Sequence, residues 1–188
     1  MKIVELKALF ERKARAMARR PVFGRGTAQA RIQLGDGLAC DVEHPERKLL
    51  VDQPVSEGGG GAGPPPDELM RASIGASLAM GYRLWGARLG VAIDAVEVEM
   101  TCEYDVRGQL GVADDVTAGW QSVRFDVAIT SAAPEAAIRH VVETADRRCP
   151  MLANLALSVR RVHHLSIVRA GVRATERAVP SDITPLGS

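Results

Sequence analysis

The chain has 188 residues, a formal net charge of +1 and 25% charged residues, which suits one domain of ordinary size with no strong electrostatic preference. A nucleic acid or an anionic membrane would call for a clustered basic excess, and aromatic side chains for base stacking make up only 4% of the residues. The composition therefore predicts neither a nucleic-acid partner nor association with a membrane.

Residues 1–22 have the pattern of an N-terminal amphipathic helix, with apolar residues near one face and basic residues over the rest. The apolar core of a secretory signal is missing. Glu5 and Glu11 count against a mitochondrial presequence. We expect this helix to dock on the body of the protein or on a partner subunit.

Residues 26–51 predict short strands joined by turns. A strand over residues 27–34 ends at Gly35-Asp36-Gly37, and glycine supplies the positive φ that a tight hairpin needs. The returning strand is expected over residues 38–43 and a third over residues 48–51. The glycine-rich run that follows, residues 57–66, predicts a loop, because it lacks the spacing of a phosphate-binding loop.

The next segment predicts a long helix. Pro66 suits a first turn, and Asp67 and Glu68 place negative charge at the positive end of the helix dipole. Residues 69–89 are apolar or small on nearly every side, so the helix must be buried all round, yet it is a little over ~30 Å long. Its arginines exclude a membrane span.

A small domain can hardly surround so long a helix. Ser73, Ser77 and Gly81 recur at four-residue spacing and form a stripe of small residues where another backbone could approach closely. We therefore expect a homodimer in which this helix packs partly against a second subunit.

Beyond the helix, residues 95–104 alternate apolar and polar, which predicts an antiparallel strand with one wet face. A long connection over residues 105–120 leads to a second alternating strand, residues 123–129. A helix then opens at Pro134, breaks at Cys149 because a proline follows, and continues as a short helix from Pro150. The order of elements predicts an α+β domain with antiparallel sheets.

The end of the chain predicts a last strand over residues 159–168 and a loose polar tail. The expected organisation is thus a helix (residues 1–22), a domain (residues 23–170) and a tail (residues 171–188). His163 and His164 would point to opposite faces of the last strand and cannot jointly bind a metal. We expect neither a metal nor a cofactor.

Cys149 is the strongest site candidate on physical grounds. It precedes a helix, and Arg147 and Arg148 adjoin it, so both the helix end and the arginines favour the reactive thiolate. A buried structural cysteine is the alternative. Cys102 belongs to the apolar face of its strand, and the facing of Cys40 is open. Three cysteines at wide spacing fit a reducing cytoplasm, where we expect the protein to lie.

Two motifs resemble those of the OsmC/Ohr family of thiol-dependent hydroperoxide reductases. The run Gly63-Pro-Pro-Pro-Asp-Glu-Leu-Met-Arg-Ala-Ser-Ile-Gly-Ala-Ser-Leu-Ala-Met80 looks like the family's proline, acid and small-small-Cys-x-Ala-Met-like helix. Cys149-Pro150 looks like its later Cys-Pro. The resemblance covers about residues 26–169. It implies an intertwined α+β homodimer in which the long, buried central helices of the two subunits pack together.

The resemblance also implies site residues. Cys149 matches the family's second, disulfide-forming cysteine, and Asp67 stands where a glutamate often is. Arg31 or Arg25 is the candidate for the arginine that holds the reactive thiolate. The family's peroxide-attacking cysteine maps onto Ser77, and a hydroxyl forms neither a sulfenic acid nor a disulfide, so the two-cysteine cycle cannot run.

Three hypotheses follow. The first is a one-cysteine redox enzyme in which Cys149 attacks a hydroperoxide and an external thiol resolves the product. The second is a non-catalytic dimer that binds a small lipophilic molecule. The third is a structural or partner-binding dimer that uses the N-terminal helix. A Ser77-His-Asp triad is disfavoured, because no nucleophile-elbow sequence surrounds Ser77.

Overall fold

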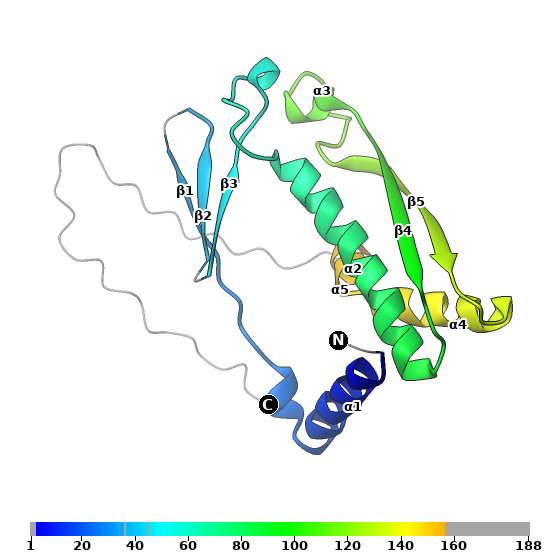
Figure 1. Ribbon diagram of the computed structural model, residues 1–188. Helices are drawn as coiled ribbons and strands as arrows, with labels where there is room; N and C mark the ends of the chain where they lie inside the picture. The colour runs from blue at the N-terminus through cyan, green and yellow to red at the C-terminus, as the bar shows by residue number, and fades with distance from the viewer. Residues whose placement is uncertain (1–2, 36, 45, 157–188) are drawn as a thin grey trace, which may run out of the picture. The chain divides into compact units, whose positions relative to one another are not determined.

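A computed structural model describes residues 3–35, 37–44 and 46–156 (Figure 1). Its elements, in chain order, are α1 (Ile3–Arg19), the 3-10 turn η1 (Pro21–Gly24), β1 (Arg31–Leu34), β2 (Cys40–His44), β3 (Arg47–Val51), the 3-10 turn η2 (Val55–Glu57), α2 (Pro66–Leu89), β4 (Ala95–Tyr104), α3 (Val106–Gln109), β5 (Trp120–Thr130), α4 (Glu135–Asp146) and α5 (Pro150–Ala156). The expected last strand, His163, His164 and the tail lie outside the described residues.

The strands form two antiparallel sheets, as the sequence predicted. One has the order β1-β2-β3, and the other is the long pair β4-β5. The predicted hairpin between β1 and β2 is confirmed: the Gly35 N–H donates to the Ala39 carbonyl at 2.8 Å, and Gly37 has φ of 70°. The first strand is shorter than predicted and begins at Arg31, because residues 27–30 pair with no neighbouring strand.

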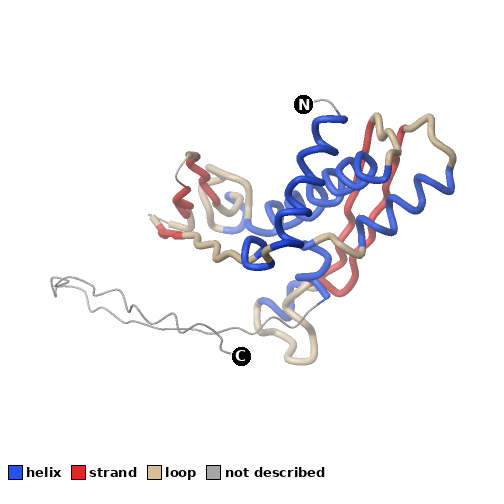
Figure 2. Tube along the Cα trace, turned by 90° about the horizontal axis from the view of Figure 1, so that it is seen from below, coloured by secondary structure: helices blue, strands red, loops and turns tan. Residues whose placement is uncertain are grey.

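The long helix α2 begins and ends at the residues that the sequence indicated. Its first turn carries Asp67 and Glu68, and Gly90 closes it with φ of 76°. The side facing the rest of the chain buries Ile74, Leu78 and Tyr82 to about 2% exposure. In Figure 2, β4 and β5 run side by side and α2 lies alongside them.

Two of the three small residues of the α2 stripe face other parts of the chain, whereas Ser73 is exposed. Gly81 faces Ala145 of α4, whose methyl group lies 3.9 Å from where a glycine Cβ would stand, and Ser77 faces Cys149. The side of α2 that stays uncovered carries Ala72, Ser73, Ala76 and Met80. One copy of the chain therefore does not bury the helix on all sides, and the expected packing of this helix against a second subunit stays a prediction.

The core lies between α2, the inward face of β4-β5 and the α4–α5 junction. Val96, Val98 and Met100 of β4 pack against it, whereas Glu97 and Glu99 stay exposed, so the predicted alternation is confirmed. The predicted long connection after β4 carries the short helix α3. Among the described residues, none of the helices combines the length and apolarity needed to cross a membrane.

The N-terminal helix α1 packs on α2, which is one of the two positions expected for it. The Phe10 ring meets the Trp85 ring edge-on, with centroids 5.5 Å apart. The Arg88 guanidinium lies 5.1 Å from the Phe10 centroid and 4.8 Å from that of Trp85. Aromatic and cation–π contacts therefore hold α1 in place.

Candidate functional site

Two of the residues singled out in the sequence meet in the core. Ser77 lies in the middle of α2 and Cys149 directly before α5, and the Ser77 Oγ is 3.5 Å from the Cys149 Sγ. The two residues are 72 positions apart, so only the packing of α2 against the α4–α5 junction brings them together. This pair of one hydroxyl and one thiol is the centre of the candidate site.

The break between α4 and α5 presents the Cys149 side chain to this position. The Cys149 N–H donates to the Asp146 carbonyl at 3.2 Å, and its own carbonyl accepts from the Ala153 N–H at 3.0 Å. The residue is only 6% exposed, and it clusters with the apolar side chains of α2 and with Ala145. A reactant must therefore come to the thiol through the protein rather than from open solvent.

The two arginines beside Cys149 have partners of their own. The Arg148 guanidinium lies 5.2 Å from the centroid of the Trp85 ring. The Arg147 Nη2 lies 3.5 Å from the Thr144 Oγ1, to which it donates a hydrogen bond. The sequence analysis expected both arginines to act on the thiol through proximity, and each also contacts another side chain.

Tyr82 is a neighbour of the thiol that the sequence analysis missed. It is 2% exposed, and its hydroxyl donates to the Asp146 Oδ1 at 2.9 Å. Burial first, and then the Asp146 carboxylate that accepts this bond, raise the pKa of Tyr82 well above its usual range. The available signal was a tyrosine on an apolar helix, because a buried hydroxyl needs a hydrogen-bond partner.

Asp67 does not touch the pair. It lies in the first turn of α2, ten residues before Ser77, which places it roughly 15 Å away along the helix axis. Its Oδ2 binds the Arg71 Nη1 at 2.5 Å, and the side chain is 54% exposed. The ion pair raises the pKa of Arg71.

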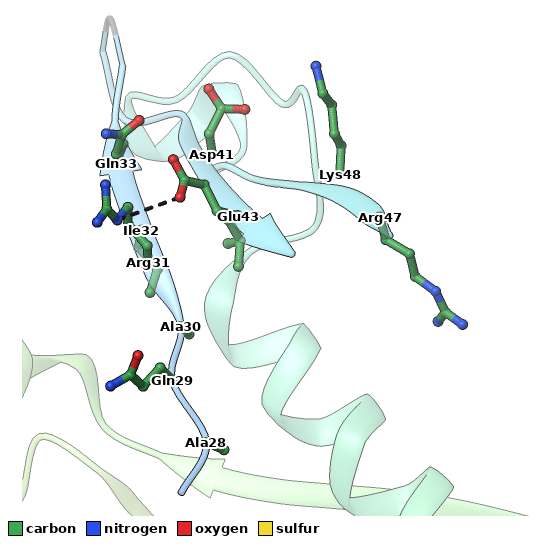
Figure 3. A pocket seen from close by; sticks show the side chains of 11 residues that line it. Ala28, Gln29, Ala30, Arg31, Ile32, Gln33, Asp41, Glu43, Arg47 and Lys48 are labelled. Atoms are coloured by element: carbon green, nitrogen blue, oxygen red, sulfur yellow. Dashed lines mark ion pairs between the residues drawn. The ribbon is translucent and has the colours of Figure 1, made fainter. Parts of the chain in front are cut away.

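Arg31 lies in a groove on the first sheet (Figure 3). Its Nε is 3.5 Å from the Glu43 Oε2 on the neighbouring strand, and the residues that line the groove come from positions 28–33, 41–43, 47 and 48. None of these belongs to α2 or α5. Arg25, the other candidate, is exposed after η1. In the part of the chain that the structure describes, neither arginine forms a hydrogen bond or an ion pair with Cys149.

A pocket of about 710 Å³ opens beside the buried pair. Its apolar lining comes from the start of α2, the open end of β4-β5 and α5, and includes Met70, Val123, Leu152 and Leu155. Leu152 and Trp120 line the pocket and also pack on the cluster that contains Cys149. One layer of side chains is therefore common to the pocket and to the surroundings of the thiol.

The glycine-rich loop before α2 is held by a buried carboxylate. Asp52 is 2% exposed, and its two oxygens accept the N–H groups of Gln53 at 2.8 Å, Gly60 at 3.0 Å and Ala62 at 3.1 Å. These hydrogen bonds lower the pKa of Asp52, and the bond from the Ala62 N–H has the largest effect. Burial acts in the opposite direction but does not outweigh them. The predicted loop is confirmed, and Asp52 is a structural residue that the sequence analysis missed.

No group of histidine, cysteine, aspartate and glutamate side chains in the described part of the chain could hold a metal ion. Cys40 and Cys102 are half-buried free thiols. Burial foremost, and the Asp67 charge, raise the pKa of Cys102, while Arg71 lowers it. Cys102 lies on the inward face of β4, as predicted.

The OsmC-like protein family model matches residues 58–161, which is more than half of the chain. Among solved structures, an OsmC-like protein from Mycoplasma pneumoniae is 14% identical with a TM-score of 0.60, over 69% of this chain and 87% of that one. The organic hydroperoxide resistance protein OsmC from Legionella pneumophila is 17% identical with a TM-score of 0.53, over 70% of this chain and 92% of that one. These likenesses show the fold. The comparison with curated proteins finds no match.

Proposed function

The chain belongs to the OsmC-like protein family, and on that premise we propose that it is a one-cysteine redox protein in which Cys149 reduces organic hydroperoxides. The observation that carries the proposal is the 3.5 Å contact between the Ser77 hydroxyl and the Cys149 thiol. Either atom can be the donor at this distance, so the Ser77 hydroxyl is placed to hydrogen-bond the sulfur that would react.

The proposed cycle balances with one hydroperoxide and two external thiols. The Cys149 thiolate attacks the terminal peroxide oxygen, the O–O bond breaks, and the departing alkoxide takes up a proton to leave an alcohol and a sulfenic acid. An external thiol attacks the sulfenic sulfur and releases water, leaving a mixed disulfide. A second external thiol then frees Cys149 and leaves as the external disulfide.

The 710 Å³ pocket supplies the approach for the organic part of the hydroperoxide. Cys149 is 6% exposed, so the peroxide group would reach it past side chains that both line the pocket and pack on the thiol cluster, such as Leu152 and Trp120. The apolar lining favours organic hydroperoxides over hydrogen peroxide, because only an organic tail buries apolar surface there.

The test treats the purified protein with cumene hydroperoxide in the presence of a sulfenic-acid trap and identifies the adduct by mass spectrometry. The adduct is expected on Cys149 and absent in Cys149→Ser, whereas Cys40→Ser and Cys102→Ser serve as matched controls that keep it. An unmodified Cys149 thiol, together with no turnover of dithiols, rules the redox proposal out.

Ser77→Cys tests whether the rest of the site is intact. The Ser77 Oγ now lies 3.5 Å from the Cys149 Sγ, so the new thiol would stand next to Cys149. We expect this variant to run a two-cysteine cycle and to consume peroxide faster. The measurement is peroxide loss with a dithiol as reductant. A variant that folds and forms no disulfide on oxidation would count against the site.

The pocket also favours a second candidate function, the binding of a small lipophilic molecule without chemistry. Its volume of about 710 Å³ lies in the range of ligand pockets, ~300–1,000 Å³, and its lining is mostly apolar. Cys149→Ser separates the two functions, because it abolishes peroxide reduction and leaves ligand binding unchanged.

We also propose that the protein is a homodimer joined through the uncovered stripe of α2. Ala72, Ala76 and Met80 are exposed there in the middle of the helix, and small residues let a second helix approach closely. Ala76→Arg is expected to give a folded monomer by light scattering, while Ala136→Arg on the exposed side of α4 leaves the dimer intact. A wild-type protein that is already monomeric would contradict the proposal.

A further inference from the structure

The charged groups in the lining of the 710 Å³ pocket are all acidic. Three carboxylates line it, those of Glu57, Asp67 and Asp105, and no lysine, arginine or histidine is among its lining residues in the described part of the chain. The three come from separate places: the turn before the glycine-rich loop, the first turn of α2, and the residue after β4. The lining therefore carries charge of one sign only.

The three carboxylates differ in how far their charge is balanced. Asp67 is paired with Arg71 and Asp105 with Arg107, each at 2.5 Å. Glu57 has no ion pair or hydrogen bond to its side chain among the described residues. Glu57 is thus the carboxylate most available to a ligand.

Two aromatic side chains share the same wall. Tyr104 and Trp120 are register partners at the end of β4-β5, so they stand on one face of the sheet, and both line the pocket. Tyr104 is 61% exposed, which leaves much of its ring uncovered in this chain. Aromatic rings and carboxylates that line one pocket are the groups that bind organic ammonium ions.

The remaining lining is apolar. Met70, Leu152 and Leu155 contribute side chains from α2 and α5, and Val106 and Val123 contribute from the β4-β5 side. This part suits an aliphatic chain or a ring and gives no partner to a second charged group. Acidic, aromatic and apolar groups that line one pocket match a molecule with a cationic head and an apolar tail.

We propose that this pocket binds an amphipathic organic cation, a quaternary or alkylated ammonium group carrying an aliphatic tail. The cation sits between Glu57 and the Tyr104–Trp120 pair, and the tail lies on Met70, Leu152 and Leu155. An anionic amphiphile such as a fatty carboxylate is disfavoured, because its head would be desolvated beside carboxylates whose arginine neighbours, Arg71 and Arg107, are already paired. The inference deepens the ligand binding proposed above and sets its charge preference.

Isothermal titration calorimetry with three probes of one chain length tests the charge preference on the full chain. The probes are octyltrimethylammonium, 1-octanol and octanoate. We expect the ammonium to bind on the order of tenfold more tightly than the alcohol, from one cation–π contact and one carboxylate, and octanoate to bind most weakly. Added salt should lower the affinity for octyltrimethylammonium alone among the three probes. Equal affinities for ammonium and alcohol, or tighter octanoate binding, would overturn the proposal.

Variants locate the site. Glu57→Gln and Tyr104→Leu are each expected to lower the ammonium affinity about three- to tenfold and to leave octanol binding unchanged. Glu97→Gln, an exposed carboxylate on the outward face of β4, is the matched control and should have no effect. The inference is refuted if Glu97→Gln loses ammonium binding, or if Glu57→Gln and Tyr104→Leu bind ammonium as tightly as the wild type. Either result would place the binding elsewhere.

The outcome is separable from that of the redox proposal. Cys149→Ser should bind octyltrimethylammonium as the wild type does. Trapping of sulfenic acid on Cys149 without any preference for the ammonium would refute only the charge preference. Ammonium binding by a protein whose Cys149 never oxidises would refute only the redox step.

Discussion

The part of the chain before residue 58 and the part from 58 to 156 differ in the interactions that stabilise them. All the buried apolar side chains of the described residues lie in the second part, between Ile74 and Cys149. In the first part the only buried residue described is Asp52, a carboxylate, and every residue of β1 is exposed. The family model matches only the second part, with a short extension beyond it.

The difference shows what each part depends on. Apolar burial holds α2, β4-β5 and α4 together, so their stability follows the apolar area removed from water. Strand pairing and the Asp52 hydrogen bonds shape the sheet β1-β2-β3 and the loop after it, which leave Ile32 and Leu34 more than half exposed. Substitutions should therefore be far more costly in the second part than in the first.

The largest effect is expected from Leu78→Ala. Leu78 is 2% exposed at the centre of the core, and its truncation leaves a cavity that costs about 2–5 kcal/mol of unfolding free energy. Leu110→Ala, at a side chain that is 71% exposed, is the control and should change stability by less than ~0.5 kcal/mol. Chemical denaturation measures both, and equal losses would contradict the comparison.

Gly63→Ala should have the next largest effect, and it lies at the border between the two parts. A Cβ there would come 2.7 Å from the Leu50 carbonyl carbon and closer still to its oxygen. The backbone must shift, at a cost of about 1–3 kcal/mol. A Cβ added at Gly26 has no atom within 4 Å. Gly26→Ala is therefore the control for the loss of conformational entropy that any Gly→Ala change causes in the unfolded chain. A Gly63→Ala protein as stable as Gly26→Ala would show that the loop adapts freely.

Tyr82→Phe removes the buried hydroxyl that donates to Asp146 and should cost about 0.5–1.5 kcal/mol near neutral pH. Folding raises the pKa of Tyr82 above the value of 10.0 for an unperturbed tyrosine, so the unfolded chain ionises first. The hydrogen bond's contribution is therefore complete below about pH 10 and declines above it.

Denaturation measured from pH 8 to 11 checks this prediction. The wild type should lose stability more steeply than Tyr82→Phe above about pH 10, because only the wild type has this titrating group. Parallel pH profiles for the two proteins would mean that Tyr82 is not protected by burial.

The smallest effect is expected from Ile32→Ala in β1. Ile32 is 56% exposed, and its cross-strand partner is Val42. Losing that pair should cost about 0.2–1 kcal/mol in the same denaturation assay. A loss as large as that of Leu78→Ala would show that the sheet face is covered in solution and would abolish the distinction between the two parts.

The sequence was sufficient for the local features. Pro66 and Gly90 set the ends of α2, alternation identified β4 and β5, and the proline after Cys149 predicted the break between α4 and α5. Each of these depends on neighbours a few residues away, because helix ends, strand faces and turns follow from local backbone preferences.

The candidate site could be predicted only in part. Family resemblance pointed to Ser77 and Cys149, and the structure brings them into contact. Asp67 and Arg31, taken from the same resemblance, lie apart from that contact and pair with Arg71 and Glu43 instead. Their proposed roles at the thiol remain predictions.

Only the tertiary structure decided which groups meet across the chain. It turned the Ser77 and Gly81 stripe toward α4 and α5, set Arg148 on Trp85, and joined Tyr82 to Asp146. These partners are 63 to 72 positions apart. The periodicity of a helix tells which residues share a face without telling what that face will meet. That choice is made by the packing of whole elements, because burying the most apolar surface settles which faces come together.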